Sequence, residues 1–330
     1  MLLAGDIGGT KTTLALFADA ATLATPAVEM TFASTHYTSL EAIIHEFLRQ
    51  HPVPVNRVAL GVAGPIIGDT AYVTNLHWQV NRQQLAAQLN GAAVYLLNDL
   101  AAIANALPIL PPADLYPLNP GQALPGGNIA VIAPGTGLGE AFLVWEGTRY
   151  HAYSSEGGHA DFAPTNDWEM RLWQYLRNGL GFDHISYEAV CSGLGIPHIY
   201  EYVKVSGYAD EPAWLAQALA ATQDPTPVIV QAALDTARPC EICTATLDTF
   251  IDILGAEAGN LALKVLATGG VYLGGGIPPR ILSKLTTGRF MEAFCNKGRF
   301  ADILRQMPVF VIGNPKAALL GAANYGFAQG

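Results

Sequence analysis

The 330-residue sequence has few charged residues and only four cysteines. Charged residues make up 13% and hydrophobic residues 51%, which excludes a disordered chain, because so apolar a sequence can bury a large core. Lys and Arg number 17 against 27 Asp and Glu, which gives a net charge of −10. We therefore expect no nucleic-acid partner and no membrane partner, since binding to anionic polymers or surfaces needs a basic face.

Targeting signals are also lacking. The N-terminus has no basic region and its apolar run ends at Asp6, unlike a signal peptide. No stretch of about 18 residues is free of polar or turn residues, as a membrane-spanning helix requires. Cysteines without a secretory signal indicate reduced thiols and a cytoplasmic protein. Cys240 and Cys243 form a lone C-x-x-C pair with no further zinc ligands nearby, so we expect a structural role.

The hydrophobic pattern predicts alternating strands and helices, typical of an α/β protein. Residues 2–17 read as a hairpin around a glycine turn, and 39–50 as an amphipathic helix capped by Ser39. The segment 107–128 is rich in proline and glycine and is predicted to connect two domains. Further helices are expected at 83–89, 100–106, 168–180, 214–221, 246–267, 279–285 and 317–327, and further strands at 58–62, 94–97, 129–132, 141–145, 270–273 and 309–312.

The glycine turn after Asp6 is suited to holding phosphate. It is not a P-loop, because Thr10 stands where a glycine must precede the lysine, and a strand rather than a helix follows. Gly8 and Gly9 have no Cβ, so backbone N–H groups can approach an anion. Thr10 adds a hydroxyl, Lys11 adds a cation, and Asp6 is placed to hold a hydrated Mg²⁺. The alternative is a hairpin turn with an incidental lysine.

A second glycine turn lies at Gly135-Thr136-Gly137-Leu138-Gly139. A strand is predicted at 141–145, so this is not a dinucleotide fingerprint, which must open a helix. Two phosphate-sized turns, one in each half of the chain, suggest a nucleotide held between two domains. The run Gly274-Gly275-Gly276 between a strand and a helix would let adenosine approach closely, although glycine-rich strand ends are common.

Polar residues at one strand end suggest a catalytic carboxylate. Asn98 and Asp99 close an apolar strand and open a helix, and ligands of open α/β sheets bind at the carboxyl ends of strands. The alternative role for Asp99 is that of a helix N-cap.

A second polar cluster surrounds Gly157 and Gly158. Its spacing of Glu156, His159 and Asp161 fits a metal site poorly, whereas carboxylates and neutral His suit the donor and acceptor groups of sugar hydroxyls. Glu188 adds a further carboxylate in a mostly apolar segment, with simple exposure to solvent as the alternative.

Taken together, these segments resemble the bacterial glucokinase family of the hexokinase/actin-like ATPase superfamily. The segment Glu156–Pro164, which reads E-G-G-H-A-D-F-A-P, is highly specific. The matching segments follow the family order over nearly the whole chain: 5–10, 97–100, 135–139, 156–164, 191–195, 274–277, 297–300 and 319–322.

The resemblance implies an α/β, two-domain actin-like ATPase (ribonuclease H-like) fold with an interdomain cleft. Residues 1–108, completed by the C-terminal helix at about 303–330, would form the small domain, and 109–302 the large one. The implied activity is transfer of the ATP γ-phosphoryl group to the 6-hydroxyl of D-glucose, with Mg²⁺ present. A homodimer is implied as well.

The resemblance also implies residue roles. Asp99 would be the general base, Asp6 would hold a metal ion through water, and Thr136 and Gly137 would lie at both substrates. The implied sugar ligands are Asn98, Asp99, Glu156, His159, Glu188, Thr136 and Gly137. The implied ATP-binding residues are Asp6, Ile7, Gly8, Gly9, Thr10, Lys11, Gly135, Thr136, Gly137, Gly274, Gly275 and Gly276.

The chain departs from the family pattern at two points. Lys11 stands where many relatives carry Asn, and Gly193-Leu194-Gly195 replaces a more usual G-P-G. The alternatives left open are a hexokinase of broader specificity, an actin-like ATPase, and a sugar sensor. The donor is either ATP or polyphosphate.

Overall fold

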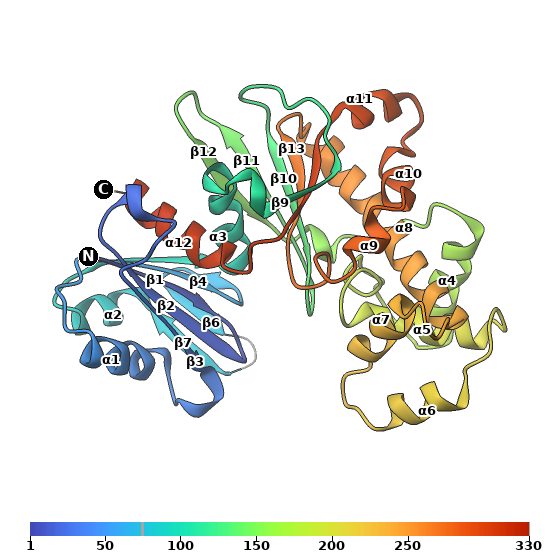
Figure 1. The fold of residues 1–330 in the computed structure, drawn as a ribbon, viewed down its shortest axis with the longest axis horizontal. Coiled ribbons are helices and arrows are strands. Elements are labelled where there is room, and N and C mark those ends of the chain that lie inside the picture. The colour runs from blue at the N-terminus through green and yellow to red at the C-terminus, as the bar shows by residue number, and fades with distance from the viewer. Residues whose placement is uncertain (74–75, 330) are drawn as a thin grey trace. The chain divides into compact units, whose positions relative to one another are not determined.

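The computed structural model describes residues 1–73 and 76–329, which pack into two compact units (Figure 1). The first unit contains Met1–Leu115, Trp145–Ser154 and the chain from Asn314 to the C-terminal end. The second contains Tyr116–Val144 and Ser155–Gly313. Each unit has its own buried hydrophobic core.

These units differ in two places from the domain boundaries expected from the sequence. The chain re-enters the first unit at Asn314 rather than near residue 303, because β14 (Val309–Ile312) pairs in parallel with β13 (Gly270–Leu273) in the second unit. The segment Trp145–Ser154 also groups with the first unit. The division into a small and a large functional domain stays a prediction.

The first unit is built on a five-stranded sheet. Its order is β3-β2-β1-β4-β8. Strand β1 is antiparallel to β2, which confirms the predicted N-terminal hairpin, and it is parallel to β4. These strands are β1 Leu2–Ile7, β2 Lys11–Phe17, β3 Val28–Ala33, β4 Arg57–Val62 and β8 Ala93–Asn98. A separate three-stranded sheet contains β5 Ile66–Ile67, β6 Thr70–Val73 and β7 Trp78–Asn81.

The helices of the first unit follow the sequence pattern closely. The predicted helix after Ser39 is confirmed, because the Ser39 side chain accepts a hydrogen bond from Ala42 N, and Ile43 and Phe47 on its apolar face are buried in the core. The helices are α1 Leu40–Gln50, α2 Arg82–Gln88, α3 Asp99–Ala106 and α12 Ala317–Ala328, with 3₁₀ turns at Ala20–Thr22, Ser34–His36, Leu107–Ile109 and Pro112–Asp114.

A six-stranded sheet has the order β12-β11-β10-β13-β14-β9. At its centre β10 pairs in parallel with β13 and antiparallel with β11. The remaining strands are β9 Leu115–Asn119, β10 Ile129–Pro134, β11 Leu138–Trp145 and β12 Tyr150–Ser155.

The buried helix α8 (Glu241–Val265) organises the second unit. Gly255 and Gly259 let α10 (Arg289–Cys295) pack closely, since a Cβ at either glycine would lie 2.5 Å from the carbonyl oxygen of Phe290 or Phe294. The other helices are α4 Asp167–Asn178, α5 Gly195–Val205, α6 Ala213–Ala220, α7 Thr226–Leu234, α9 Leu282–Leu285 and α11 Ala301–Gln306, with 3₁₀ turns at Gly157–His159 and Gly298–Phe300.

Several elements differ from the sequence expectations. The helix expected at 279–285 is only the short α9, and the connector expected at 107–128 contains β9. The pattern gave no indication of β3, β12, α5, α7, α10 or α11. Helix α5 begins with a glycine and has a proline in its first turn, so its stability comes from packing rather than propensity. No helix within residues 1–73 and 76–329 is long and apolar enough to cross a membrane.

The contact between α12 and α3 depends on Gly321. A Cβ there would overlap the carbonyl oxygen of Ala102, which is backbone and cannot rotate away. We expect Gly321→Val to lower the free energy of unfolding by about 1–3 kcal/mol, as overpacked sites do. Urea titration would measure this loss. The exposed Ala328→Val on the same helix is the matched control, and equal midpoints for the two variants would contradict the prediction.

Candidate active site

The N-terminal glycine turn joins β1 to β2 and is held by two hydrogen bonds from Ser34. The Ser34 hydroxyl donates to Gly8 O at 2.8 Å, and its backbone N–H donates to Thr10 O at 3.0 Å. Gly8 N–H donates to Lys11 O at 3.0 Å, which closes the turn. Sequence reasoning missed Ser34, because it is 26 residues away from Gly8 and only strand pairing brings it there.

Asp6 has a perturbed carboxylate at the end of β1. Burial, and to a smaller extent the negative charge of Asp99, raise its pKa to about 6, although the positive charge of Lys11 opposes the change. Two carboxylates and one lysine therefore act on each other within the first unit. A divalent cation would offset both the desolvation cost of the Asp6 carboxylate and its repulsion by Asp99, so Asp6 fits the predicted role of holding a hydrated metal ion.

The structure separates the roles of Asn98 and Asp99. Asn98 is the N-cap of α3, and its Oδ1 accepts a hydrogen bond from Ala101 N at 2.6 Å. The alternative role of Asp99 as N-cap is therefore wrong, because its neighbour fills that position. The Asn98 oxygen is committed to the helix, which leaves the amide N–H₂ group for a ligand.

Asp99 is the first residue of α3 and is exposed as a residue, although neighbouring atoms partly desolvate its carboxyl group. Its Oδ1 accepts a hydrogen bond from Leu100 N at 2.9 Å. Desolvation raises the pKa of Asp99, whereas the backbone hydrogen bonds at the helix start lower it. A carboxylate that is fixed by the first turn of a helix can accept a proton from an incoming hydroxyl group.

In the second unit, the two glycine motifs interlock. Gly158 lies so close to β11 that a Cβ would overlap the carbonyl oxygen of Leu138. Leu138 N–H donates to Glu188 Oε2 at 2.9 Å, and Glu188 N–H donates to Gly158 O at 2.8 Å. Glu188 is therefore held at the start of β11 against Gly137, with its other carboxylate oxygen left for a ligand.

The turn at 135–137 is held from two sides. Gly193 N–H donates to Gly135 O at 2.8 Å, and Leu194 N–H donates to Thr136 O at 3.2 Å. Gly275 has a φ of 81°, and a Cβ there would lie 2.5 Å from the carbonyl oxygen of Pro134. The third glycine run thus packs on the strand that leads into the second phosphate turn, an arrangement that sequence proximity alone does not reveal.

The predicted site residues fall into two groups, one in each unit. The first unit contains Asp6, the 7–11 turn, Asn98 and Asp99. The second contains the 135–137 turn, the 274–276 run, and the carboxylates and histidine of the polar segment. Glu156 and His159 are exposed there, while Asp161 bonds to His184 instead at 3.0 Å. The described residues contain no cluster of three or more potential metal ligands.

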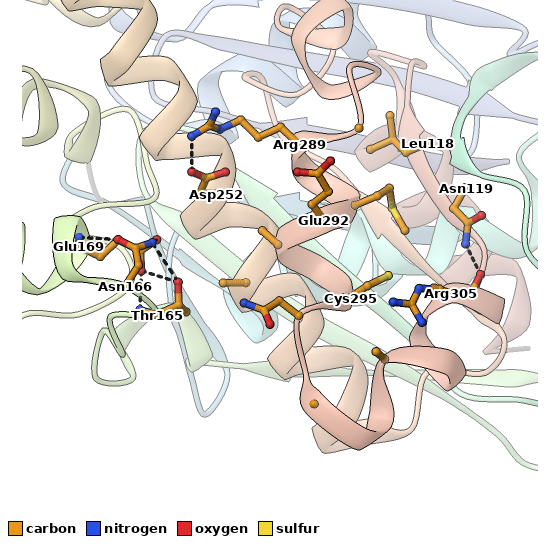
Figure 2. Close-up of a pocket in the computed structure, with 17 residues that line it drawn as sticks. Leu118, Asn119, Thr165, Asn166, Glu169, Asp252, Arg289, Glu292, Cys295 and Arg305 are labelled. Carbon is orange, nitrogen blue, oxygen red and sulfur yellow. Dashed lines mark hydrogen bonds and ion pairs between the residues drawn. The ribbon is translucent and has the colours of Figure 1, made fainter.

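A groove of about 1060 Å³ lies elsewhere in the second unit, and none of the predicted site residues line it (Figure 2). Several of its charged groups already have partners. Arg289 pairs with Asp252 at 2.6 Å, and Glu169 accepts hydrogen bonds from Thr165. We therefore place the candidate site at the glycine turns rather than in this groove.

A glycine hairpin beside two interacting carboxylates, and a second glycine turn joined to a carboxylate-bearing segment, define a mixed α/β protein of the sugar-kinase class. The comparisons with known proteins make this specific. The family model described as Glucokinase matches residues 3–328, and the chain belongs to that family. The resemblance found in the sequence is thereby confirmed.

Curated relatives match along the whole chain. The chain is 40% identical to the glucokinase of Nostoc punctiforme, over 98% of both chains. It is 37% identical to the glucokinase of Yersinia pestis, over 98% of this chain and 95% of that one.

Solved structures agree. A glucokinase from an Antarctic psychrotroph is 34% identical, with a TM-score of 0.84 and 99% of this chain covered, against 98% of that chain. A Balamuthia mandrillaris glucokinase in complex with glucose is 22% identical, with a TM-score of 0.80, over all of this chain and 93% of that one, and shares the fold. A ROK family glucokinase from Streptomyces griseus, in complex with glucose and AMPPNP, is 19% identical, with a TM-score of 0.64, over 100% and 99% of the two chains.

The raised pKa of Asp6 generates a prediction. We expect its carboxyl ¹³C resonance to titrate with a midpoint of about 6, lower in Asp99→Asn and higher in Lys11→Met, because each change removes one of the charges that act on it. Because the pKa of Asp6 is higher in the folded than in the unfolded protein, its ionisation destabilises the fold, and the free energy of unfolding of the wild type falls as pH rises from 3.8 to about 6. Asp6→Asn cannot ionise, so it should gain stability relative to the wild type over that range.

The matched control is Glu41→Gln on α1, which should leave the Asp6 midpoint unchanged. A wild-type midpoint near 4, or one that Asp99→Asn does not move, would contradict this account of the site.

Proposed function

We propose that this chain is an ATP-dependent glucokinase that transfers the γ-phosphoryl group of ATP to the 6-hydroxyl of D-glucose, giving glucose 6-phosphate and ADP. The observation that carries the proposal is the match to the glucokinase family over residues 3–328, which contains every glycine turn and carboxylate described above.

In the first unit, Asp99 is the proposed general base. It accepts the proton of the sugar 6-hydroxyl as the oxygen attacks phosphorus, and its position at the start of α3 keeps the carboxylate oriented. General-base assistance of this kind contributes about 10²–10⁴-fold. The amide of Asn98 donates to a neighbouring hydroxyl group while its oxygen caps the helix.

In the second unit, Glu156, His159 and Glu188 are the proposed ligands of the remaining glucose hydroxyls. The hydrogen bond from Leu138 N to Glu188 supports this assignment, because it fixes one carboxylate oxygen and so orients the carboxylate group. Several fixed polar groups are what a polyhydroxylated substrate requires for orientation. Thr136 and Gly137 lie beside Glu188, where sugar and phosphate would meet.

The glycine turns are the proposed nucleotide ligands. The backbone N–H groups of 7–11 and 135–137 that are not bonded within the turns stabilise phosphate oxygens, and the 274–276 run takes the adenosine. Asp6 would hold Mg²⁺ through water, and the fit rests on its partly buried carboxylate and the neighbouring charge of Asp99. When bound, the ion neutralises charge on the transferring phosphoryl group.

We further propose an actin-like ATPase fold in which the two units act as the small and large domains and close over glucose. Closure would exclude water, which otherwise competes as phosphoryl acceptor. A homodimer and a cytoplasmic location belong to the same proposal and follow from the resemblance to the family.

A coupled assay with different hexoses and donors separates the proposal from its alternatives. Glucose-dependent ADP production supports a kinase over an actin-like ATPase or a sugar sensor. Comparable kcat/KM for fructose or mannose would show a hexokinase of broader specificity. Product formation with polyphosphate in place of ATP would overturn the assignment of the donor.

Asp99→Asn tests the base. The substitution keeps the size of the side chain and the helix start, so we expect a folded protein that binds glucose normally but has kcat lowered about 10²–10⁴-fold. Glucose titration by calorimetry and steady-state kinetics measure the two quantities.

Glu156→Gln is the matched control. It changes the same charge in an exposed sugar ligand, and it should raise the KM for glucose more than it lowers kcat. Near-normal kcat in Asp99→Asn would rule out the assignment of the base.

A further inference from the structure

Two carboxylic acids, Glu140 on β11 and Glu257 on α8, are buried side by side in the second unit. Their residues are 1% and 0% exposed to solvent. The two carboxyl groups are within hydrogen-bonding reach of each other. Buried charged groups are costly unless they are paired, so two facing carboxylates must be explained.

Among the residues that the structure describes, the other polar partners of the pair interact with Glu257. Lys264 forms an ion pair with it at 3.3 Å, and Asn260 donates to it at 2.8 Å. The Tyr187 hydroxyl also bonds to Glu257 and accepts a hydrogen bond from Asn260 at 3.0 Å. These three contacts, with a cation and two hydrogen-bond donors, all act on Glu257.

Glu140 has no such support. Its Oε1 is buried without a hydrogen-bond partner among the residues that the structure describes. The titratable groups that interact with the carboxyl pair are Tyr187, Cys191 and Lys297, besides Lys264 of α8. Burial raises the pKa of the Cys191 thiol and lowers the pKa of the Lys297 ammonium group, and neither hydrogen-bonds Glu140.

The other oxygen of Glu140, Oε2, lies against the proposed sugar-binding turn at 156–159. A Cβ at Gly157 would overlap Glu140 Oε2, so the turn that carries Glu156 and His159 packs on this carboxyl group. Gly157 N–H donates a hydrogen bond to Ser155 Oγ at 3.0 Å, which helps to hold the turn in this position. A change in the position or charge of the Glu140 carboxyl group therefore acts directly on the turn.

Burial and the charge of Glu257 together raise the pKa of Glu140 to about 8, although Lys264 opposes the shift. Near neutral pH the pair therefore shares one proton, and an O–H···O⁻ bond between carboxyl groups is short and strong. Above that pH two buried carboxylates face each other and repel.

We propose that Glu140 is a positioning residue for sugar binding: its protonated carboxyl group, bound to Glu257, supports Gly157 and holds Glu156 and His159 in the geometry that binds glucose. The inference rests on the proposed function. The proposal adds a pH-dependent carboxyl group that contacts the sugar-binding turn and lies outside the glycine and polar motifs identified in the sequence.

The first experiment measures proton uptake. Because glucose favours the protonated form, its binding at pH 8 should take up protons, measured by calorimetry in two buffers with different ionisation enthalpies. Glu140→Gln should show none of this uptake, since the amide keeps the hydrogen bond to Glu257 but does not titrate. The exposed Glu201→Gln on α5 is the matched control and should behave as the wild type.

The second experiment follows kinetics against pH. The wild-type KM for glucose should rise about tenfold between pH 7 and pH 9, as the competent fraction falls, while the KM for ATP stays unchanged. Glu140→Gln should keep a low glucose KM across this range. Glu140→Ala, which removes the support, should raise it at every pH.

The outcomes are distinguishable. Absence of glucose-dependent ADP formation by the wild type would overturn the proposed function and this inference with it. An active wild type whose proton uptake and KM profile are unchanged in Glu140→Gln would overturn this inference alone. A purely structural role for Glu140 predicts lower thermal stability in Glu140→Ala with a glucose KM that does not depend on pH.

Discussion

The close packing of the turn at Gly157 and Gly158 onto β11 is the constraint on which the second half of the site depends. Because neither residue has a Cβ, the backbone lies directly on the Leu138 carbonyl and the Glu140 carboxyl group. The same strand start binds Glu188 through Leu138 N–H. One short stretch of β11 therefore sets the positions of the proposed sugar-binding turn at 156–159, of Glu188 and of the proposed phosphate turn at 135–137 together.

Carboxylate pairs occur in both units, in opposite environments. Asp6 and Asp99 act on each other where Asp99 is exposed as a residue, which is consistent with their proposed roles toward a metal ion and a substrate proton. Glu140 and Glu257 act on each other deep in the core, where only a shared proton relieves the repulsion. This difference in solvent access suits Asp6 and Asp99 to the proposed catalytic site, and Glu140 and Glu257 to the proposed positioning of the sugar-binding turn.

The sequence predicted local features well wherever a strong local signal existed. The β1–β2 hairpin, the capped helix α1 and the long helix α8 have clear apolar periodicity or turn residues. The helix expected at 279–285 was predicted too long, because the chain forms turns up to Ile281 and α9 begins only at Leu282. Asp99 was assigned correctly to a strand end, but which residue caps the helix depended on a contact between Asn98 and Ala101.

By itself, the sequence determined the family, the two glycine turns and the residue types of the candidate site, because turns and motifs are local and depend on the absence of a Cβ or the presence of a carboxylate. Only the tertiary structure decided that Ser34 fixes the first turn, that Gly193 and Gly275 hold the second, and that Glu140 faces Glu257. These residues are far apart along the chain, and each alone resembles an ordinary polar or glycine position. Their roles arise only when strand pairing and helix packing bring them into contact.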